Sequence, residues 1–181
     1  MRKNIIYSLL LVVAALFAGC DSRLDIEKHG NMGDQNDFYQ TDEQIEQAVA
    51  SMYSNLKGLY YNWFFTKNLL SDDVWCGGGQ RGDNTSLEQL NEYTYGTDNG
   101  MIQGVFSGLY GLIYQCNLVI EKVADDTPVK KRAIAEAKFF RAWANFELVT
   151  LWGTAPLVDH LLEPGEYRQG NSTPEALWAA V

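Results

Sequence analysis

The chain has 181 residues, of which 46% are hydrophobic and 20% charged, and its formal net charge at pH 7 is −9. An acidic surface repels nucleic acid and anionic lipid headgroups, so we exclude both as partners. The length is sufficient for one folded domain. The charge suits a neutral ligand or a protein partner with basic patches.

The N-terminus has the pattern of a lipoprotein export signal. Arg2 and Lys3 open the chain, and a nearly uninterrupted apolar run over residues 5–18 is too short for a comfortable membrane span. The run ends in LFAGC, which resembles a lipoprotein box whose cysteine takes a diacylglycerol before the signal is cleaved. We therefore expect residues 1–19 to be a signal peptide and Cys20 to be the lipidated residue. An ordinary secretory signal followed by an unrelated cysteine is the alternative.

The polar residues 20–38 are expected to form a tether between the lipid and the folded body. Acidic residues just after Cys20 resemble the surface-export signal of Bacteroidetes lipoproteins. That resemblance implies a lipid-anchored protein of the cell outer membrane that faces the medium. Cleavage before Cys20 removes two basic residues and no acidic one, which takes the net charge from −9 to −11.

The first helix is predicted from residue 42 to about residue 60. Thr41 and Gln44 have capping-box spacing, and apolar residues follow at helical spacing. A second, shorter helix is expected over residues 65–70. An aromatic group lies around this boundary, with a spacing more typical of a core than of a ligand platform: Tyr60, Tyr61, Trp63 and Phe64.

Residues 71–99 are predicted to form a long loop, because three consecutive glycines cannot lie inside a helix. Long loops in compact domains are more often functional than idle. Trp75 offers a flat ring for the C–H face of a sugar, while Asp73 and Arg81 offer polar partners for its hydroxyls. These three residues are the candidate ligand site. In the alternative, Trp75 packs under its own loop and Arg81 pairs with Asp83.

A helical hairpin is predicted next, with one helix over residues 101–123 and another that opens at Pro128. The connecting turn is short, so the two helices must be antiparallel. Ala137 and Ala144 resemble the small positions of a tetratricopeptide second helix. Three glycines on the first helix lower its propensity but let another helix approach closely: Gly104, Gly108 and Gly111.

Residues 135–158 read AEAKFFRAWANFELVTLWGTAPLV. Apolar side chains recur on two faces, which predicts a helix sandwiched between neighbours and ended by Gly153. Arg141 on this mostly buried helix must be paired, so we expect a structural ion pair or a carbonyl clamp. A capping box at Ser172 and Glu175 then begins a further helix.

The segment 135–158 closely resembles the A-E-A-[KR]-F-x-R-A…Y/F-x-L-V…G-x-P-L-V pattern of the SusD/RagB family. The resemblance implies an all-α (mainly α) fold of tetratricopeptide-like hairpins with long irregular loops. It also implies that residues 39–181 are the N-terminal part, about a third, of a longer helical domain. Members of this family place ligand-contacting residues, often a Trp, in the loop region after their first helices, which supports Trp75, Asp73 and Arg81.

The same resemblance implies a surface lipoprotein that captures nutrients, mostly glycans, for a SusC-like TonB-dependent transporter. A peptide-capturing relative of the same fold is an alternative, and a helical-repeat adaptor for protein partners is another. A transporter gene next to this one would favour the first two hypotheses.

Patterns of catalysis and of metal or cofactor binding are missing from the sequence: there is no serine elbow, phosphate loop or zinc spacing. Asp72 and Asp73 are paired acids, but adjacent side chains rarely face one glycosidic bond. We therefore expect no enzyme activity, no cofactor and no metal. Cys76 and Cys116 could form a disulfide in an exported protein or remain free thiols.

Overall fold

The structure is a computed structural model that describes residues 38–181. The predicted signal peptide, Cys20 and the tether up to residue 37 lie outside these residues. The described residues are mainly helical, which confirms the predicted fold class, and their only β structure is an isolated antiparallel bridge between Ala155 and Ser172. In chain order the helices are α3 (Asp42–Leu69), α4 (Thr85–Asn91), α5 (Gly100–Lys122), α6 (Pro128–Trp152), the 3₁₀ helix η2 (Pro164–Glu166) and α7 (Pro174–Ala179).

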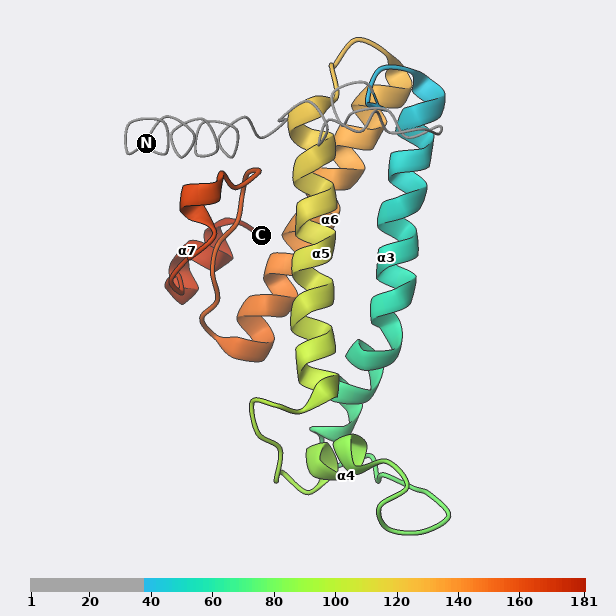
Figure 1. Ribbon diagram of the computed structural model, residues 1–181, viewed down its shortest axis with the longest axis vertical. Coiled ribbons are helices and arrows are strands. Elements are labelled where there is room, and N and C mark those ends of the chain that lie inside the picture. Colours follow the sequence, from blue (N-terminus) through green and yellow to red (C-terminus); the bar gives the residue numbers. More distant parts are fainter. Residues whose placement is uncertain (1–37) are drawn as a thin grey trace, which may run out of the picture. The chain divides into compact units, whose positions relative to one another are not determined.

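Three long helices, α3, α5 and α6, pack against one another (Figure 1). α5 runs antiparallel to both α3 and α6, and the turn between α5 and α6 is short, as the sequence predicts. α4 and the loop before it lie at the opposite end of the bundle from that turn, and α7 packs on α6. α4 contacts α3 and α5, so these two helices hold the loop region at one end of the bundle.

Local signals explain where the helices begin and end. At the start of α3, the backbone N–H of Gln44 donates to Thr41 Oγ1 at 3.3 Å, and the Gln44 side chain accepts from the Thr41 N–H at 3.0 Å. The Thr127 hydroxyl caps α6 in front of Pro128. Gly153 ends α6 with a φ of 73°, which a glycine adopts without steric cost.

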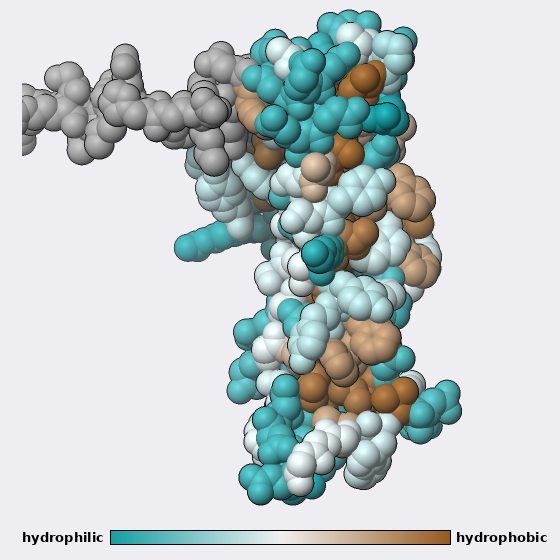
Figure 2. Space-filling view, turned by 90° about the vertical axis from the view of Figure 1, so that its right-hand side faces the viewer, coloured by the Kyte–Doolittle hydropathy of each residue, from teal (hydrophilic) through white to brown (hydrophobic). Residues whose placement is uncertain are grey.

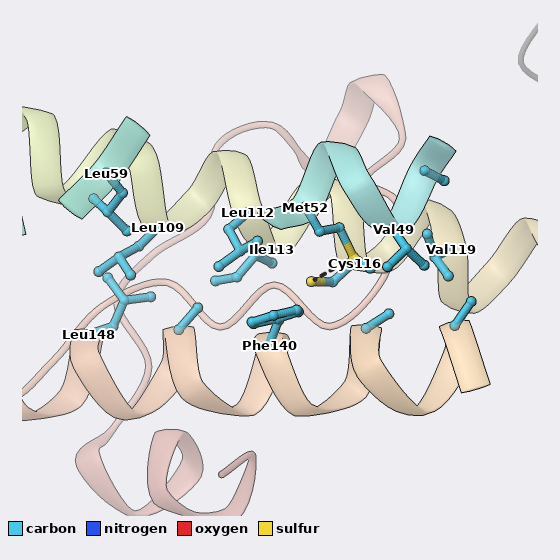
Figure 3. Close-up of a cluster of buried hydrophobic side chains, with 14 of the residues drawn as sticks. Val49, Met52, Leu59, Leu109, Leu112, Ile113, Cys116, Val119, Phe140 and Leu148 are labelled. Atoms are coloured by element: carbon cyan, nitrogen blue, oxygen red, sulfur yellow. Dashed lines mark hydrogen bonds between the residues drawn. The ribbon is translucent and has the colours of Figure 1, made fainter. Parts of the chain in front are cut away.

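The core lies between the three long helices (Figure 3). Each helix turns an apolar stripe inward, because side chains three and four positions apart share one face. The contact at the centre is between sulfur atoms, with Cys116 Sγ 3.8 Å from Met52 Sδ. The other labelled core side chains are Val49, Leu59, Leu109, Leu112, Ile113, Val119, Phe140 and Leu148.

Glycines on α5 permit its close contact with α3, as predicted. A Cβ placed on Gly108 would lie 2.8 Å from Leu59 Cδ1, closer than two carbon atoms can pack. A Cβ on Gly104 would meet the side-chain amide of Asn62. The two helices thus approach so closely that a larger residue at either position would require the facing side chain of α3 to shift.

Three local predictions were wrong. α3 is one continuous helix to Leu69 and not two helices, because neither a proline nor a cap interrupts the aromatic stretch. The region predicted as loop contains α4, whose N-cap is Asn84. The cap of α7 is Thr173, one residue later than predicted, and its hydroxyl accepts from the N–H of Ala176 at 3.3 Å.

Aromatic side chains are more exposed than predicted. Figure 2 looks onto the side of the bundle formed by α3, where apolar and weakly polar residues gather along the helix. On α6, the face with Phe140 and Leu148 is buried, but Phe139 on the second face is 68% exposed. The predicted second face of α6 is therefore only partly covered, since Trp143 packs against the core whereas Phe139 lies at the surface. Three of the α3 aromatics expected in the core are surface residues: Tyr60, Tyr61 and Phe64.

The Arg141 prediction is confirmed as a carbonyl clamp. One guanidinium nitrogen donates to Asn117 Oδ1 at 2.8 Å and to the backbone carbonyl of Asp159. Asn117 in turn donates to the carbonyl of His160 at 2.9 Å. The two side chains fix the segment after α6 against the α5–α6 hairpin.

Candidate functional site

The loop between α3 and α4 surrounds a hollow of about 280 Å³. Two of the three predicted site residues, Trp75 and Arg81, line it. The loop also contributes Cys76, Gly77, Gly78 and Gln80 to the wall. The remaining wall comes from polar residues of α4 and its C-terminal cap: Glu88, Asn91 and Glu92.

Trp75 is positioned through the backbone of the residues before and after it, and its ring is exposed to solvent. The side chain of Asn91 accepts from the N–H of Cys76 at 3.0 Å and donates to the carbonyl of Val74 at 3.2 Å. These two bonds fix the chain on either side of Trp75, while Trp75 itself is 81% exposed. The alternative in which Trp75 packs under its own loop is therefore wrong. An exposed, positioned indole can pack on the C–H face of a ring-shaped ligand.

Arg81 is paired with Glu92 and not with Asp83. Its two terminal nitrogens donate to the two Glu92 carboxylate oxygens at 2.6 and 2.8 Å, a fork-to-fork geometry. The hydrogen bond with Glu92 raises the pKa of Arg81 above its ordinary value, so the guanidinium is charged throughout the physiological range. Because two of its donor groups are occupied by Glu92, the remaining N–H groups of Arg81 are those available to a ligand.

Asp83 organises the glycine-rich turn. Its Oδ2 accepts from the N–H groups of Gly79 and Gln80 at 2.6 and 3.0 Å. Gly82 has a φ of 92°, a conformation that favours glycine, and its N–H donates to Glu88 Oε1 at 2.7 Å. The turn is thus fixed by α4 as well as by its own carboxylate.

Asp73 is not among the residues that line the Trp75 hollow. Its backbone N–H donates to Ser71 Oγ at 3.4 Å. The neighbouring Asp72 accepts from the hydroxyl of Tyr93 at 3.3 Å, and Tyr93 has a φ of 56°, unusual for a residue with a side chain. The structure therefore brings together Trp75 and Arg81, and leaves Asp73 outside their hollow.

The cysteines do not form a disulfide: Cys76 and Cys116 are both free, so that alternative is wrong. Burial raises the pKa of the Cys76 thiol, with a further contribution from Glu88 and Glu92, so it stays protonated at neutral pH. Among residues 38–181 no group of His, Cys, Asp or Glu is placed to hold a metal ion. None of the helices in the same range is both long and apolar enough to cross a bilayer.

The contributions of Asn91, Glu92 and Glu88 were not predicted from the sequence, because α4 was not expected. A signal for this helix was present. Asn84 is a good N-cap residue, and Leu87 and Leu90 stand three positions apart, as on one face of a helix. The preceding glycines obscured this short pattern.

Comparison with known proteins places the chain in a family. Residues 24–174 match the model of a SusD-like family described as "starch-binding associating with outer membrane". A SusD-like protein of Bacteroides ovatus is 32% identical over 166 residues, which cover 84% of this chain and 29% of the relative. A SusD-like protein of Formosa agariphila is 27% identical and is matched over 86% of this chain and 30% of its own length. The chain thus spans under a third of the length of either relative.

Solved structures show the same fold. A laminarin-binding SusD-like protein superposes with a TM-score of 0.70 at 25% identity, over 78% of this chain and 32% of its own. Surface glycan-binding protein A from Bacteroides uniformis superposes with a TM-score of 0.65 at 22% identity, over 77% of this chain and 32% of its own. The matched family model, the relative at 32% identity and the shared helical fold agree with the resemblance carried by residues 135–158. The chain belongs to the SusD-like family.

Proposed function

We propose that the protein is a surface lipoprotein of the outer membrane that binds a neutral glycan and delivers it to a TonB-dependent transporter. In this proposal residues 1–19 are a signal peptide, Cys20 carries the lipid, residues 20–38 are the tether and residues 39–181 are the N-terminal part of the binding protein. Binding involves no bond making or breaking. Membership of a family described as starch-binding, and the laminarin-binding structural relative, support the ligand class.

The observation that carries the proposal is the exposed Trp75 ring on a fixed loop. A sugar ring packs its C–H face on the indole, and its hydroxyls accept from the remaining N–H groups of Arg81 or donate to Glu88 and Glu92. We place Asp73 at the periphery of this site, where it would meet a ligand longer than the hollow.

Binding of laminarihexaose and maltohexaose, followed by isothermal titration calorimetry, tests this site. Trp75→Ala should weaken binding of the preferred oligosaccharide about tenfold, which corresponds to about 1.4 kcal/mol, because the stacking surface is lost. Trp178→Ala on α7 is the matched control, since that indole is also exposed and does not line the hollow. Equal affinities of Trp75→Ala and the unaltered chain would exclude the Trp75 site.

The transporter partnership has its own test. We expect the lipidated protein, purified from outer membranes, to bring a TonB-dependent transporter with it, detected by mass spectrometry. Soluble proteins in place of a transporter would instead favour the adaptor hypothesis.

A further inference from the structure

A second hollow, of about 350 Å³, lies where the end of α3, the segment before α5 and the end of α6 meet. It shares no lining residue with the Trp75 hollow. Its wall includes a buried threonine and two large aromatic side chains: Thr66, Tyr95 and Trp152.

The hollow continues into a neighbouring one of about 380 Å³, with which it shares Thr97, Ile102 and Trp152. Gln103 and Phe106 extend the wall there. No residue that lines either hollow carries a charge, in contrast to the Trp75 hollow with its arginine and two glutamates. A charged ligand would lose its hydration here without gaining an ion pair, so the trough formed by the two hollows selects a neutral ligand.

Thr66, which lines this trough, carries an unsatisfied polar group. The residue is 3% exposed, and its hydroxyl has no hydrogen-bond partner in the protein. A threonine inside a helix can bond to a carbonyl one turn earlier, as Thr150 does to the Phe146 carbonyl at 2.8 Å on α6. Thr66 makes no such bond. Because buried hydroxyls are nearly always paired, this one is a candidate contact for a bound molecule.

The aromatic side chains supply the complementary surface. Trp152 is held edge-on against Phe106, with ring centroids 5.2 Å apart, which fixes the plane of its indole. Tyr95 is 40% exposed and lines the same hollow. One fixed ring and one exposed ring beside a hydroxyl match the chemistry of a sugar, whose C–H groups pack on rings and whose hydroxyls need hydrogen bonds.

We propose that this trough is a second, separate subsite for a neutral sugar unit, which stacks on Trp152 and Tyr95 and hydrogen-bonds to the Thr66 hydroxyl. The choice of a sugar as ligand rests on the proposed function. The location rests on the cavity, the unpaired hydroxyl and the absence of charge from the lining residues.

NMR spectra of the full chain can test the two sites separately, because each tryptophan gives its own indole N–H signal. Trp75→Phe and Trp152→Phe assign the two relevant signals. We expect titration with laminarihexaose or maltohexaose to shift both signals, with separate saturation curves. A shift of the Trp75 signal alone would overturn the second subsite and leave the proposed function intact. A shift of the Trp152 signal alone would support the second subsite and overturn the Trp75 site, and no shift of either would overturn both.

Thr66→Val tests the hydroxyl without changing the shape of the side chain. The affinity read from the Trp152 signal should fall about three- to tenfold, as expected for one lost hydrogen bond, while the affinity read from Trp75 stays unchanged. The variant should also unfold at a higher urea concentration, because a buried unpaired hydroxyl is replaced by a methyl group. This combination of higher stability and weaker binding is the result that a purely structural threonine would not produce.

Thr150→Val is the matched control, since its hydroxyl already bonds to its own helix and it lies outside the trough. It should leave both affinities unchanged. An unchanged Trp152 titration in Thr66→Val would overturn the role of the hydroxyl. Shifts of the Trp152 signal by the tripeptide Ala-Leu-Ala with no shift by either oligosaccharide would overturn the sugar subsite and indicate an apolar side chain as the occupant.

Discussion

Among single residues, His160 makes the contacts of the segment after α6 depend on pH. Its Nδ1 lies 2.8 Å from Asp159 Oδ1 and its Nε2 lies 3.2 Å from Glu166 Oε2. The contact with Asp159, reinforced by Glu166, raises the pKa of His160 above its ordinary 6.5. The contact with His160 lowers the pKa of Asp159, and that of Glu166 is lowered first by a backbone hydrogen bond at Glu163 and then by His160.

These pKa shifts predict a range of pH in which the backbone amides of the segment 159–166 exchange most slowly with solvent. Protonated His160 contributes its full stabilisation below about pH 6.5. This contribution is lost as the pH rises through the higher pKa that His160 has in the folded protein. The stabilising contribution of the Asp159 and Glu166 carboxylates is present above the ordinary pKa values of these groups, about 4 to 4.5. It is lost as the pH falls. Amide hydrogen exchange of Glu163, whose N–H donates to Glu166 Oε2 at 2.9 Å, should therefore be slowest, after correction for intrinsic rates, between about pH 4.5 and 6.5. His160→Asn should remove the loss of protection on the alkaline side, and an unchanged profile in this variant would contradict the assignment.

Lys67 on α3 and Glu147 on α6 form a partly buried ion pair. Glu147 is 2% exposed, and both of its oxygens accept from Lys67 Nζ, at 3.2 and 3.0 Å. Lys67→Met leaves a buried carboxylate without its partner, so urea unfolding should show a loss of about 2 kcal/mol. The loss is smaller than for a fully buried pair because the Lys67 side chain is 35% exposed.

Two further variants check this interpretation. The double variant Lys67→Met with Glu147→Leu should recover most of the lost stability, since no buried charge remains. Lys131→Met, in an exposed pair with Asp125, should have almost no effect on unfolding. A loss in Lys131→Met equal to that in Lys67→Met would show that burial is not the cause.

At the scale of elements, glycines at two helical positions should respond in opposite ways to the same substitution. A Cβ on Gly58 of α3 meets nothing within 4 Å, so Gly58→Ala should stabilise the protein by about 0.5–1 kcal/mol through helix propensity. A Cβ on Gly108 of α5 meets buried Leu59, so Gly108→Ala should destabilise by about 1 kcal/mol net, because overpacking exceeds the propensity gain. Urea unfolding of the two variants measures both effects, and stabilisation by both would contradict the close contact of α3 and α5.

The short helix α4 fixes the conformation of the Trp75 loop. Its N-cap is Asn84, and its last residue, Asn91, bonds to the backbone on both sides of Trp75. Glu92 just after it binds Arg81. A loop rich in glycine thus gains a fixed geometry from seven helical residues, which favours a preformed binding surface over one that orders on binding.

At the scale of the whole molecule, the proposed lipid anchor determines where the protein works. Cys20→Ala removes the thiol that would carry the lipid. We expect this variant to move from the membrane fraction to the soluble fraction after cell lysis and ultracentrifugation. Asp21→Ala, which keeps Cys20, should remain with membranes, whereas full membrane association of Cys20→Ala would contradict lipidation.

Residue type and spacing were sufficient to predict the start of α3 and both ends of α6. The capping box at Thr41, the proline at residue 128 and the glycine at residue 153 act within one helical turn, so their effects are visible in the sequence. The family segment over residues 135–158 and the candidate residues Trp75 and Arg81 were also accessible in this way. Each of these features depends on neighbours in the chain, for which residue type and spacing are sufficient.

Which side chains meet across the molecule depends on how the helices pack. The pairing of Lys67 with Glu147 spans 80 positions, and the trough at Thr66 joins the ends of three helices. The exclusion of Asp73 from the Trp75 hollow depends in the same way on how α4 folds against the loop. Such contacts follow from the packing of helices whose surfaces are locally alike, so residue type and spacing do not specify them, and the fold does.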